Sequence, residues 1–577
     1  MEKWFVMRKG APFDEIAEKF HISPIVARLI RNRNIVGDEA IEEYLNGTLL
    51  DLYDGMLMKD MQKAVDILIE KIRDGKKIRI IGDYDIDGIN ATYILLEGLL
   101  ALGANVDTDI PERVKDGYGL NRQLLELAKK DGVDTVITCD NGIAATEEIA
   151  YGKKLGITII VTDHHEVPEI LPEADAIVNP KQKDCPYPFS ELCGAAVAYK
   201  LVEVLFEVLG EDVEDIDYLM ENVAIATVGD VMPLIKENRI FVKQGLEMLR
   251  RTKNQGLRAL MDANQVLAEQ VNAYHIGFVL GPCLNATGRL DTAKRALELL
   301  CAKDEEEARS LAIELKAMND KRKEMTVLAV EQAISEIEKG TLKDDKVLVV
   351  YLPDCHESLA GIVAGRIRER YYKPTLVLTK TENGVKGSAR SIEEYDMYQA
   401  LCECQMLLTK FGGHKLAAGM SLAEKNVEPL RCMLNQYCKL TEEDLTAKVS
   451  IDMQLPFANV NEELIEQLEV LEPFGKENAK PIFAEKDVEI LNARIFGNRQ
   501  NVLRMQVINA QGVRMNAVYF GGVQEFLEFL VNKYDENKVD MMLSGQRSGI
   551  KVSLTYYPTT NEYMGKTYLQ IVIGHYQ

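Results

Sequence analysis

The chain has 577 residues, 47% of them hydrophobic; because this length exceeds what one hydrophobic core can organise, we expect about three or four domains. Its formal net charge of −23 argues against a surface that coats nucleic acid throughout, although a local basic groove is compatible with it. No run approaches the roughly 18 to 20 apolar residues of a membrane span, and the N-terminus lacks the basic segment followed by an apolar one that marks a signal peptide. The ten cysteines are scattered and form no CxxC pair. We therefore expect the protein to work in the reducing cytoplasm.

The first 75 residues have a helical and partly irregular pattern. Short helices are expected at 15–20 and 25–33, and residues 61–73 have an amphipathic helical pattern. None of these residues indicates chemistry. We therefore expect the segment 1–75 to pack on the domain that follows it.

An apolar run at 78–81 is followed by three carboxylates at alternate positions, Asp83, Asp85 and Asp87. The run predicts a buried strand, and ligands of open α/β sheets lie beyond the carboxyl ends of the strands. A helix cap or a turn would explain one of these aspartates. Three within five residues instead indicate a site for a hard divalent cation.

The same pattern recurs downstream. Residues 133–140 and 157–163 are apolar runs that end in an acid, and the second is followed by His164 and His165. Residues 223–230 are a fourth candidate strand, although their period is closer to that of a helix. Helical patterns separate the first three runs, which predicts right-handed crossovers and a parallel sheet.

The carboxyl ends of parallel strands meet at one rim, so the acids that follow them can share one site. Five carboxylates and one imidazole suit two ions such as Mn²⁺ or Mg²⁺ better than one structural zinc. The expected metal ligands are Asp83, Asp85, Asp87, Asp140, His164 and Asp230.

Residues 236–342 are predicted to be a helical connector. Asn285 and Arg289 within it are polar groups that a substrate could use, although each alone is more often a solvated or capping residue. A smaller α/β unit is expected at 343–440. Its segment 386–391 combines hydroxyls with a guanidinium, a plausible phosphate cradle, and the glycines at 411–414 suggest either close approach of a ligand or tight turns.

Short β-rich runs dominate residues 448–577, including one at 539–543. Strands separated by turns predict a small barrel, and we favour an OB-fold. Cationic and aromatic side chains occur together in these runs, as they do in a groove that binds single-stranded nucleic acid. A domain that only packs on its neighbours would need some of the same aromatic residues. The candidate groove residues are Arg494, Arg504, Tyr519 and Phe520.

Several motifs together resemble a known superfamily. Those similar to the DHH phosphoesterases are GDYDIDG at 82–88, TCDNG at 138–142, DHH at 163–165 and GD at 229–230. Those similar to the accompanying DHHA1 domain are KGSARS at 386–391 and FGGH at 411–414. Those that resemble the RecJ family of single-strand-specific exonucleases in particular are GPCLNATGR at 281–289, GIVA at 361–364 and LEPFG at 471–475.

The resemblance implies an α/β fold in which a parallel-sheet DHH domain (76–235) is joined by long helices (236–342) to a smaller α/β DHHA1 domain (343–440), with a C-terminal OB-fold barrel (448–577). It implies a 5′-to-3′ exonuclease on single-stranded DNA that acts in repair and recombination and depends on two Mn²⁺ or Mg²⁺ ions. Single-strand-binding protein and a helicase are implied partners, and we expect a monomer.

Site roles also follow from the resemblance. The six residues above would hold the metals, with Asp140 as the bridge, and His165 would contact the scissile phosphate or act as the acid. The residues implied in substrate binding are Asn285, Arg289, His356, Arg366, Ser388, Arg390, Ser391, Gly412, Gly413 and His414. The chain departs from the usual pattern, without losing a metal ligand, at Cys283, Cys355, Glu357, Ala389, Glu477 and Ala479.

Two other functions are compatible with parts of the sequence. Small DHH proteins hydrolyse short oligonucleotides or cyclic dinucleotides, although a barrel after residue 450 is more than such a substrate needs. A non-catalytic scaffold for repair proteins is a further alternative, and loss of metal ligands would be its signature.

Overall fold

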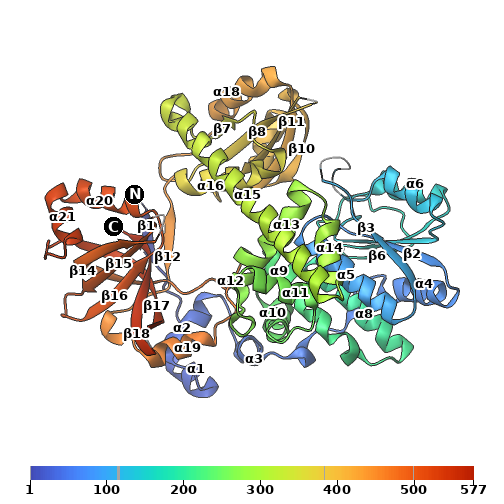
Figure 1. Cartoon of the computed structure of the whole chain (residues 1–577), viewed down its shortest axis with the longest axis horizontal. Helices are drawn as coiled ribbons and strands as arrows, with labels where there is room; N and C mark the ends of the chain where they lie inside the picture. The colour runs from blue at the N-terminus through green and yellow to red at the C-terminus, as the bar shows by residue number, and fades with distance from the viewer. Residues whose placement is uncertain (1, 114–116, 118, 383, 498–499, 564) are drawn as a thin grey trace. The chain divides into compact units, whose positions relative to one another are not determined.

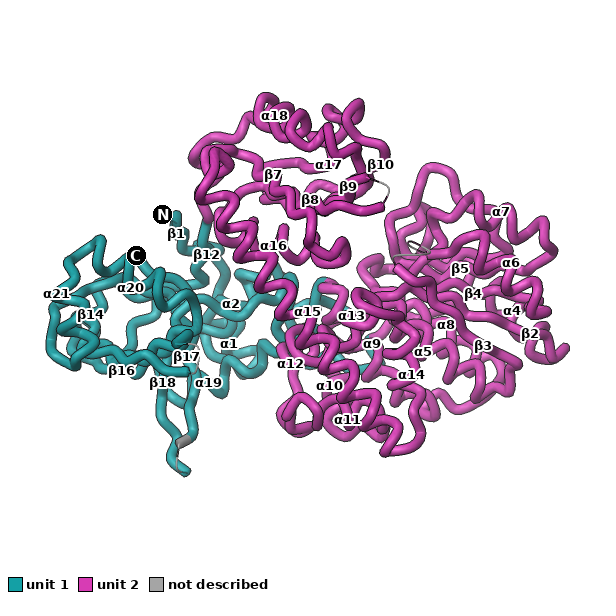
Figure 2. Tube along the Cα trace, turned by 45° about the horizontal axis from the view of Figure 1, so that its top comes forward, with its two compact units in different colours: residues 1–51, 233–236, 448–577 teal, residues 52–232, 237–447 magenta. Residues whose placement is uncertain are grey.

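The computed structural model describes residues 2–113, 117, 119–382, 384–497, 500–563 and 565–577. It divides into two compact units (Figure 2). The terminal unit comprises residues 1–51, 233–236 and 448–577, and the central unit comprises 52–232 and 237–447. None of the described helices combines the length and the apolar composition that a membrane span requires.

The first sheet of the central unit is parallel, and its described strands follow the order β3-β2-β4-β5-β6 (Figure 1). Its inner strands are buried on both faces, as expected where helices cover a parallel sheet. The strands are β2 (Lys77–Ile81), β3 (Asn105–Asp109), β4 (Thr135–Cys139), β5 (Thr158–Thr162) and β6 (Ala176–Val178). The crossover helices are α5 (Ile86–Ala101), α6 (Arg122–Lys130) and α7 (Thr146–Lys154).

The edge strand β3 was not expected from the sequence, and the expectation of a strand at residues 223–230 is wrong. β3 is short and polar, and Asp107 on it accepts two hydrogen bonds from Arg79 of β2. Residues 223–230 are not a strand, because they belong to helix α9 (Met220–Gly229) and its cap. The helix is buried on nearly all sides, between α5 and α8 (Gly194–Leu209), so its apolar run carries no amphipathic period.

Helices fill the region from residue 236 to 340, as the helical pattern predicts. Three consecutive segments, α12 (Ala273–His275), the π-helical η5 (Ile276–Leu280) and α13 (Gly281–Leu290), form one continuous helix. Pro282 explains the π-helical turn before it. In a regular α-helix its ring would collide with the carbonyl four residues earlier, and it has no N–H to donate to that carbonyl. The 35-residue α15 (Glu305–Lys339) then leads to the second sheet.

The second sheet is mixed, with described strands in the order β10-β11-β9-β8-β7. One face packs on an apolar core that includes Leu376, Ala389 and Met420. The strands are β7 (Leu348–Tyr351), β8 (Thr375–Thr381), β9 (Gly384–Arg390), β10 (Leu408–His414) and β11 (Ala417–Leu422). The helices around them are α16 (Ala360–Tyr371), α17 (Met397–Glu403) and α18 (Val427–Tyr437).

The terminal unit contains the OB-like sheet that the β-rich pattern predicts. Its described strands pair as β14-β15-β16-β18-β17, and β17 pairs again with β14, so the sheet nearly closes into a barrel. These strands are β14 (Phe483–Phe496), β15 (Val502–Ile508), β16 (Arg514–Tyr519), β17 (Lys551–Tyr563) and β18 (Lys566–Tyr576).

Residues 539–543 are not the strand that we expected. They form the end of helix α21 (Glu536–Leu543), which follows α20 (Val523–Lys533). Val539 and Met542 are buried three positions apart, which is a helical spacing. A five-residue apolar run does not distinguish a strand from the buried face of a short helix.

The expected packing of segment 1–75 on the sheet domain is wrong for residues 1–51. Strand β1 (Lys3–Val6) pairs in parallel with β12 (Lys448–Ile451). Helices α2 (Pro24–Asn32) and α3 (Asp38–Asn46) contribute to the apolar core of the barrel. The remainder of the segment belongs to the central unit, where α4 (Met61–Arg73) packs against β6 and α8 and the short turn Gly55–Leu57 also packs against α8. An amphipathic pattern predicts an apolar face, but it does not identify the surface that covers this face.

Candidate metal centre and basic pocket

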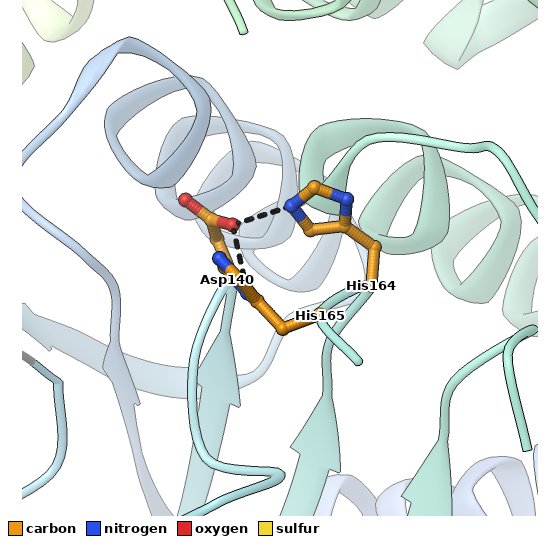
Figure 3. A group of neighbouring side chains, drawn as sticks. All are labelled: Asp140, His164 and His165. Carbon is orange, nitrogen blue, oxygen red and sulfur yellow. Dashed lines mark ion pairs between the residues drawn. The ribbon is translucent and has the colours of Figure 1, made fainter. Parts of the chain in front are cut away.

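The six expected metal ligands lie together at the carboxyl rim of the parallel sheet. Their positions follow from the strands and helices that carry them: Asp83 and Asp85 follow β2, Asp87 lies in the first turn of α5, Asp140 follows β4, His164 follows β5, and Asp230 caps the end of α9. The His164 Nε2 atom lies 3.1 Å from Oδ1 of Asp140, 3.4 Å from Oδ2 of Asp87 and 3.8 Å from Oδ2 of Asp230. Figure 3 shows one carboxylate oxygen of Asp140 directed at a ring nitrogen of both His164 and His165.

Three groups of these side chains could each hold an ion, because their ligand atoms lie within 4.8 Å of one another. Asp140 and His164 each occur in two of the groups, and of these two side chains only the carboxylate of Asp140 offers two oxygens with which to bridge ions, as proposed for it. The groups are Asp83 with Asp85 and Asp140; Asp87 with His164 and Asp230; and Asp140 with His164 and His165.

The cluster has the properties of a cation site. Burial, with the neighbouring carboxylates, raises the pKa of Asp83 and of Asp140 well above the usual value, and burial raises that of Asp87. The buried Oδ1 of Asp83 has no hydrogen-bond partner among the described residues. Carboxylates in such surroundings ionise readily when a hard cation neutralises them, so the donor set fits Mn²⁺ or Mg²⁺.

Helix α8 supports the cluster from behind. The backbone N–H groups of Gly194 and Ala195, at its first turn, donate to the two carboxylate oxygens of Asp87 at 2.6 and 2.7 Å. A Cβ on Gly194 would lie 2.7 Å from the Cβ of Asp140. The small residues that open this helix therefore allow its N-terminus to reach the acids. Asp85 does cap α5, as the simpler interpretation proposed for one aspartate.

Asp163, which our reasoning did not place in the site, orients His165. Its Oδ1 lies 2.8 Å from Nδ1 of His165 and accepts the backbone N–H groups of His164 and His165, while Oδ2 accepts from Ile143. Burial tends to lower the pKa of His165, but the hydrogen bond and charge of Asp163 outweigh it and raise this pKa to about 9. An acid directly before two histidines was the available sequence signal.

Helix α13 braces the acid loop. Asn285 Oδ1 accepts the N–H of Ile86 at 2.9 Å, and a Cβ on Gly288 would lie 2.3 Å from the carbonyl oxygen of Tyr84. Arg289 Nη1 donates to the carbonyl of Ser358 at 2.8 Å, which ties the connector to the second sheet. Asn285 is thus a positioning residue for the metal-binding loop.

A basic pocket of about 680 Å³ adjoins the cluster. Its only acid among the described lining residues, Glu357, pairs with Lys386 at 2.9 Å, so the remaining charge is positive. Burial and the nearby Arg113 and Arg322 lower the pKa of Arg289 to about 10. The cations that line the pocket are Arg113, Arg289, Lys386, Arg390 and Lys410.

Three of these five cations, Arg113, Lys386 and Lys410, were absent from our expected set. Arg113 lies over the ring of Tyr84, 4.7 Å from its centroid, in the loop after β3. Recognition of β3 as a strand would have placed Arg113 at the rim. Lys386 and Ser388 are two positions apart, as are Lys410 and Gly412, so each pair lies on one face of its strand, and this spacing was the signal for the two lysines.

The pocket floor is one face of the second sheet. Register aligns its residues in three rows across β10, β11 and β9, with cations in the outer rows and almost no side chains in the middle row. The rows are Lys410, Ser421 and Lys386; Gly412, Gly419 and Ser388; and His414, Ala417 and Arg390. A Cβ on Gly412 or Gly419 would meet nothing within 4 Å, and neither has a left-handed φ, so the fold does not require glycine there.

Other residues expected to bind substrate make contacts within the protein itself. Ser391 is buried and donates to the carbonyl of Tyr395, and Gly413 has a φ of 146° and lies close to Ala417. His356 caps the turn at Glu357–Leu359 through Ser358. Arg366 is exposed and lies 3.7 Å from Glu369.

The candidate groove on the barrel is only partly assembled. Arg494 and Arg504 are cross-strand neighbours, and Arg504 lies over the exposed ring of Phe496, 5.0 Å from its centroid. Phe520 is 60% exposed. Tyr519 instead packs against Phe526 and Tyr576 at the edge of the apolar core.

Comparison with known proteins covers all three regions. The family model for the DHH family N-terminal domain matches residues 77–227, that for the DHHA1 domain matches 344–440, and that for the RecJ OB domain matches 451–575.

Several relatives that the chain resembles carry the name single-stranded-DNA-specific exonuclease RecJ. The protein from Bacillus subtilis is 38% identical over 91% of this chain and 66% of its own length. The proteins from Haemophilus influenzae and Escherichia coli are 33% and 32% identical, over 96% and 97% of both chains. The crystal structure of RecJ in complex with Mn²⁺ from Thermus thermophilus has a TM-score of 0.82 and 27% identity, covering all of this chain and 79% of that one.

Proposed function

The chain belongs to the RecJ family of single-stranded-DNA-specific exonucleases, and we propose that it hydrolyses single-stranded DNA from the 5′ end, releasing mononucleotides. The observation that carries this proposal is the metal-ligand cluster beside a basic pocket within one compact unit. The cluster supplies the hydrolytic chemistry, and the pocket supplies cations for a polyanionic strand.

The chain's own residues divide the work. Asp83, Asp85, Asp87, Asp140, His164 and Asp230 would hold two divalent ions, which when bound activate water and neutralise charge on the phosphate. Asp163 holds His165 through Nδ1, so that Nε2 remains available to the scissile phosphate or to the leaving oxygen.

Phosphate binding is assigned to the second sheet. Arg390 donates from Nη1 to Ser388 Oγ at 3.1 Å, so the guanidinium and the hydroxyl lie together on the pocket floor. Arg289 faces the same pocket, and His414 lies on the same sheet face in the row of Arg390. Guanidinium groups and hydroxyls in this arrangement suit the oxygens of a phosphodiester.

The second candidate function keeps the chemistry and changes the substrate to short oligonucleotides or cyclic dinucleotides. The pocket volume alone is compatible with it, whereas the family resemblance extends over the barrel, which a dinucleotide does not need. A non-catalytic scaffold is disfavoured, because every expected metal ligand is present at the rim.

Partners and setting are proposed on the resemblance alone. They comprise a role in DNA repair and recombination, contacts with a single-strand-binding protein and a helicase, a monomeric state and the cytoplasm.

The decisive experiment is digestion, with Mn²⁺, of single strands labelled at the 5′ or the 3′ end, together with a dinucleotide. We expect early release of the 5′ label as a mononucleotide. Asp140→Asn should abolish turnover but keep or raise the metal-free unfolding temperature, because it removes one of several repelling buried carboxylates. First release of the 3′ label, or an active Asp140→Asn variant, would contradict the proposal.

A further inference from the structure

The continuous helix from Ala273 to Leu290 has a stripe of side chains along one face that is exposed at Tyr274 and Phe278 and partly buried toward Arg289. Positions on the opposite side, such as Ile276, Leu280 and Leu284, are buried. The stripe consists of accessible residues at helical spacing: Tyr274, Phe278, Pro282, Asn285 and Arg289.

Two aromatic rings begin this stripe. Tyr274 is 63% exposed and Phe278 is 68% exposed, and their rings stack with centroids 5.0 Å apart and an interplanar angle of 27°. A single exposed apolar residue is ordinary. A stacked pair that stays in water, on a helix whose π turn is of a kind often found at functional sites, suits a flat partner that covers the rings.

The other end of the stripe lies in the proposed substrate site. Arg289 lines the basic pocket, and Asn285 braces the metal-binding loop. With a rise of about 1.5 Å per residue, Phe278 lies roughly 16 Å from Arg289 along the helix and Tyr274 roughly 22 Å. A strand whose phosphates occupy the pocket therefore reaches the rings within a few nucleotides.

Positive charge accompanies this stripe. Helix α15 packs beside α13 and carries Arg322, which lies close enough to Arg289 to affect its ionisation. Arg366 on α16 is a further cation near Arg322. These cations lie toward the Arg289 end of the stripe and the two exposed rings lie at its other end. Cations along the path of a strand, combined with aromatic rings, are the means by which proteins bind single-stranded nucleic acid without regard to sequence.

We propose that Tyr274 and Phe278 are a base-stacking platform for the part of the DNA strand that trails from the active site. This inference rests on the proposed function, and it adds a binding site outside the metal cluster and the pocket. The platform takes any base, because every base presents a π face. Its contribution therefore depends on strand length and not on sequence.

The first test measures affinity of the full-length, metal-free chain for fluorescently labelled single strands of increasing length, starting from a dinucleotide. Tyr274→Ala with Phe278→Ala should weaken binding of the longer strands about tenfold or more, and leave the dinucleotide unchanged. Tyr437→Ala is the matched control, because Tyr437 is 47% exposed at the end of α18, away from the stripe. Unchanged affinity at every length would overturn the proposal and favour a protein as the occupant.

A second test separates stacking from simple apolar contact. Phe278→Trp should keep the affinity, whereas Phe278→Leu should lose as much as Phe278→Ala, because leucine offers bulk without a π face. Strands with abasic nucleotides in the trailing part should bind the wild type as weakly as intact strands bind the double alanine variant. Abasic strands should bind the double variant no more weakly than that. Additive losses would overturn the assignment.

These outcomes are distinct from failure of the proposed function. A wild-type chain that binds no single-stranded DNA would refute the exonuclease proposal itself. A wild type that binds and degrades DNA, with variants that match it at every length, would refute the platform alone.

Discussion

Asp163 is the buried carboxylate on which the orientation of His165 depends. We expect Asp163→Asn to lower kcat about 10- to 100-fold, because the amide cannot replace the charge that holds the imidazole, while KM for single-stranded DNA changes little. Steady-state kinetics at saturating Mn²⁺ measure both quantities. Asp175→Asn is the control, because Asp175 also accepts a backbone N–H, that of Ile159 in β5, but lies outside the cluster. A raised KM with unchanged kcat would contradict the assignment.

Gly419 occupies a place where the fold tolerates a side chain. The lack of a side chain there is best explained by the room that the substrate needs. We expect Gly419→Ala to keep or raise the unfolding temperature, because alanine loses less chain entropy on folding. It should raise KM for single-stranded DNA about tenfold, since a methyl group intrudes on the pocket floor.

The control for this prediction is Gly365→Ala on α16. Gly365 also has open space around a built Cβ and no left-handed φ, but it is not among the residues that line the pocket. It should leave KM unchanged. An equal KM for both variants would remove the proposed role of Gly419.

Two departures from the family pattern have structural explanations. Cys283 is fully buried between α13 and α15, where its sulfur accepts a hydrogen bond from Asn319. Glu357 forms an ion pair with Lys386 at the pocket edge, which reduces the positive charge there. Neither change touches the metal cluster.

At the scale of elements, helix α9 buries the carboxyl group of Glu221, which has Thr252 as its hydrogen-bond donor. Burial raises its pKa from 4.5 to about 7. The folded state therefore binds more protons than the unfolded state between these values, so stability is highest below pH 4.5 and falls as pH rises to about 7.

We expect Glu221→Gln to remove this dependence and to raise the free energy of unfolding at pH 8 by up to about 3 kcal/mol. Denaturant titrations of the metal-free chain at pH 5 and pH 8 measure the difference. The exposed Glu207 on α8 provides the control, and Glu207→Gln should change neither value. A gain that is equal at both pH values would show that the charge of Glu221 is not the cause.

At the scale of the whole molecule, the terminal unit is built from both ends of the chain. Leu29 and Ile41 share an apolar core with Leu468 and Phe526. Removal of residues 448–577 alone would leave this N-terminal apolar surface uncovered.

We therefore expect fragment 1–447 to aggregate, whereas fragment 52–447 stays monodisperse and hydrolyses short strands. The shorter fragment should bind long strands more weakly than the full chain, because it lacks the barrel with Arg494 and Arg504. Light scattering and binding by strand length provide the measurements. A fragment 52–447 with the full affinity for long strands would exclude the barrel from binding.

The sequence by itself determined the local features of this protein. Apolar runs that end in acids predicted β2, β4 and β5 and the ligands at their ends, because a buried parallel strand needs a continuous apolar run and its carboxyl end lies at the rim. The hydroxyls and the guanidinium at 386–391 likewise predicted a phosphate-binding surface, which stays a prediction. These features depend on residues that are neighbours along the chain, so the residue pattern is enough to predict them.

Tertiary structure alone decided which distant surfaces meet. Residues 223–230 had a helix-like period, but the apolar run of this buried helix also fits a buried strand that ends in an acid, and the shortness of α21 hides its period. The partner of the N-terminal helices, the support of His165 by Asp163, and the bare row of Gly412 and Gly419 depend on contacts or strand register. An apolar pattern predicts that a face is covered, but it does not predict which part of the chain covers it.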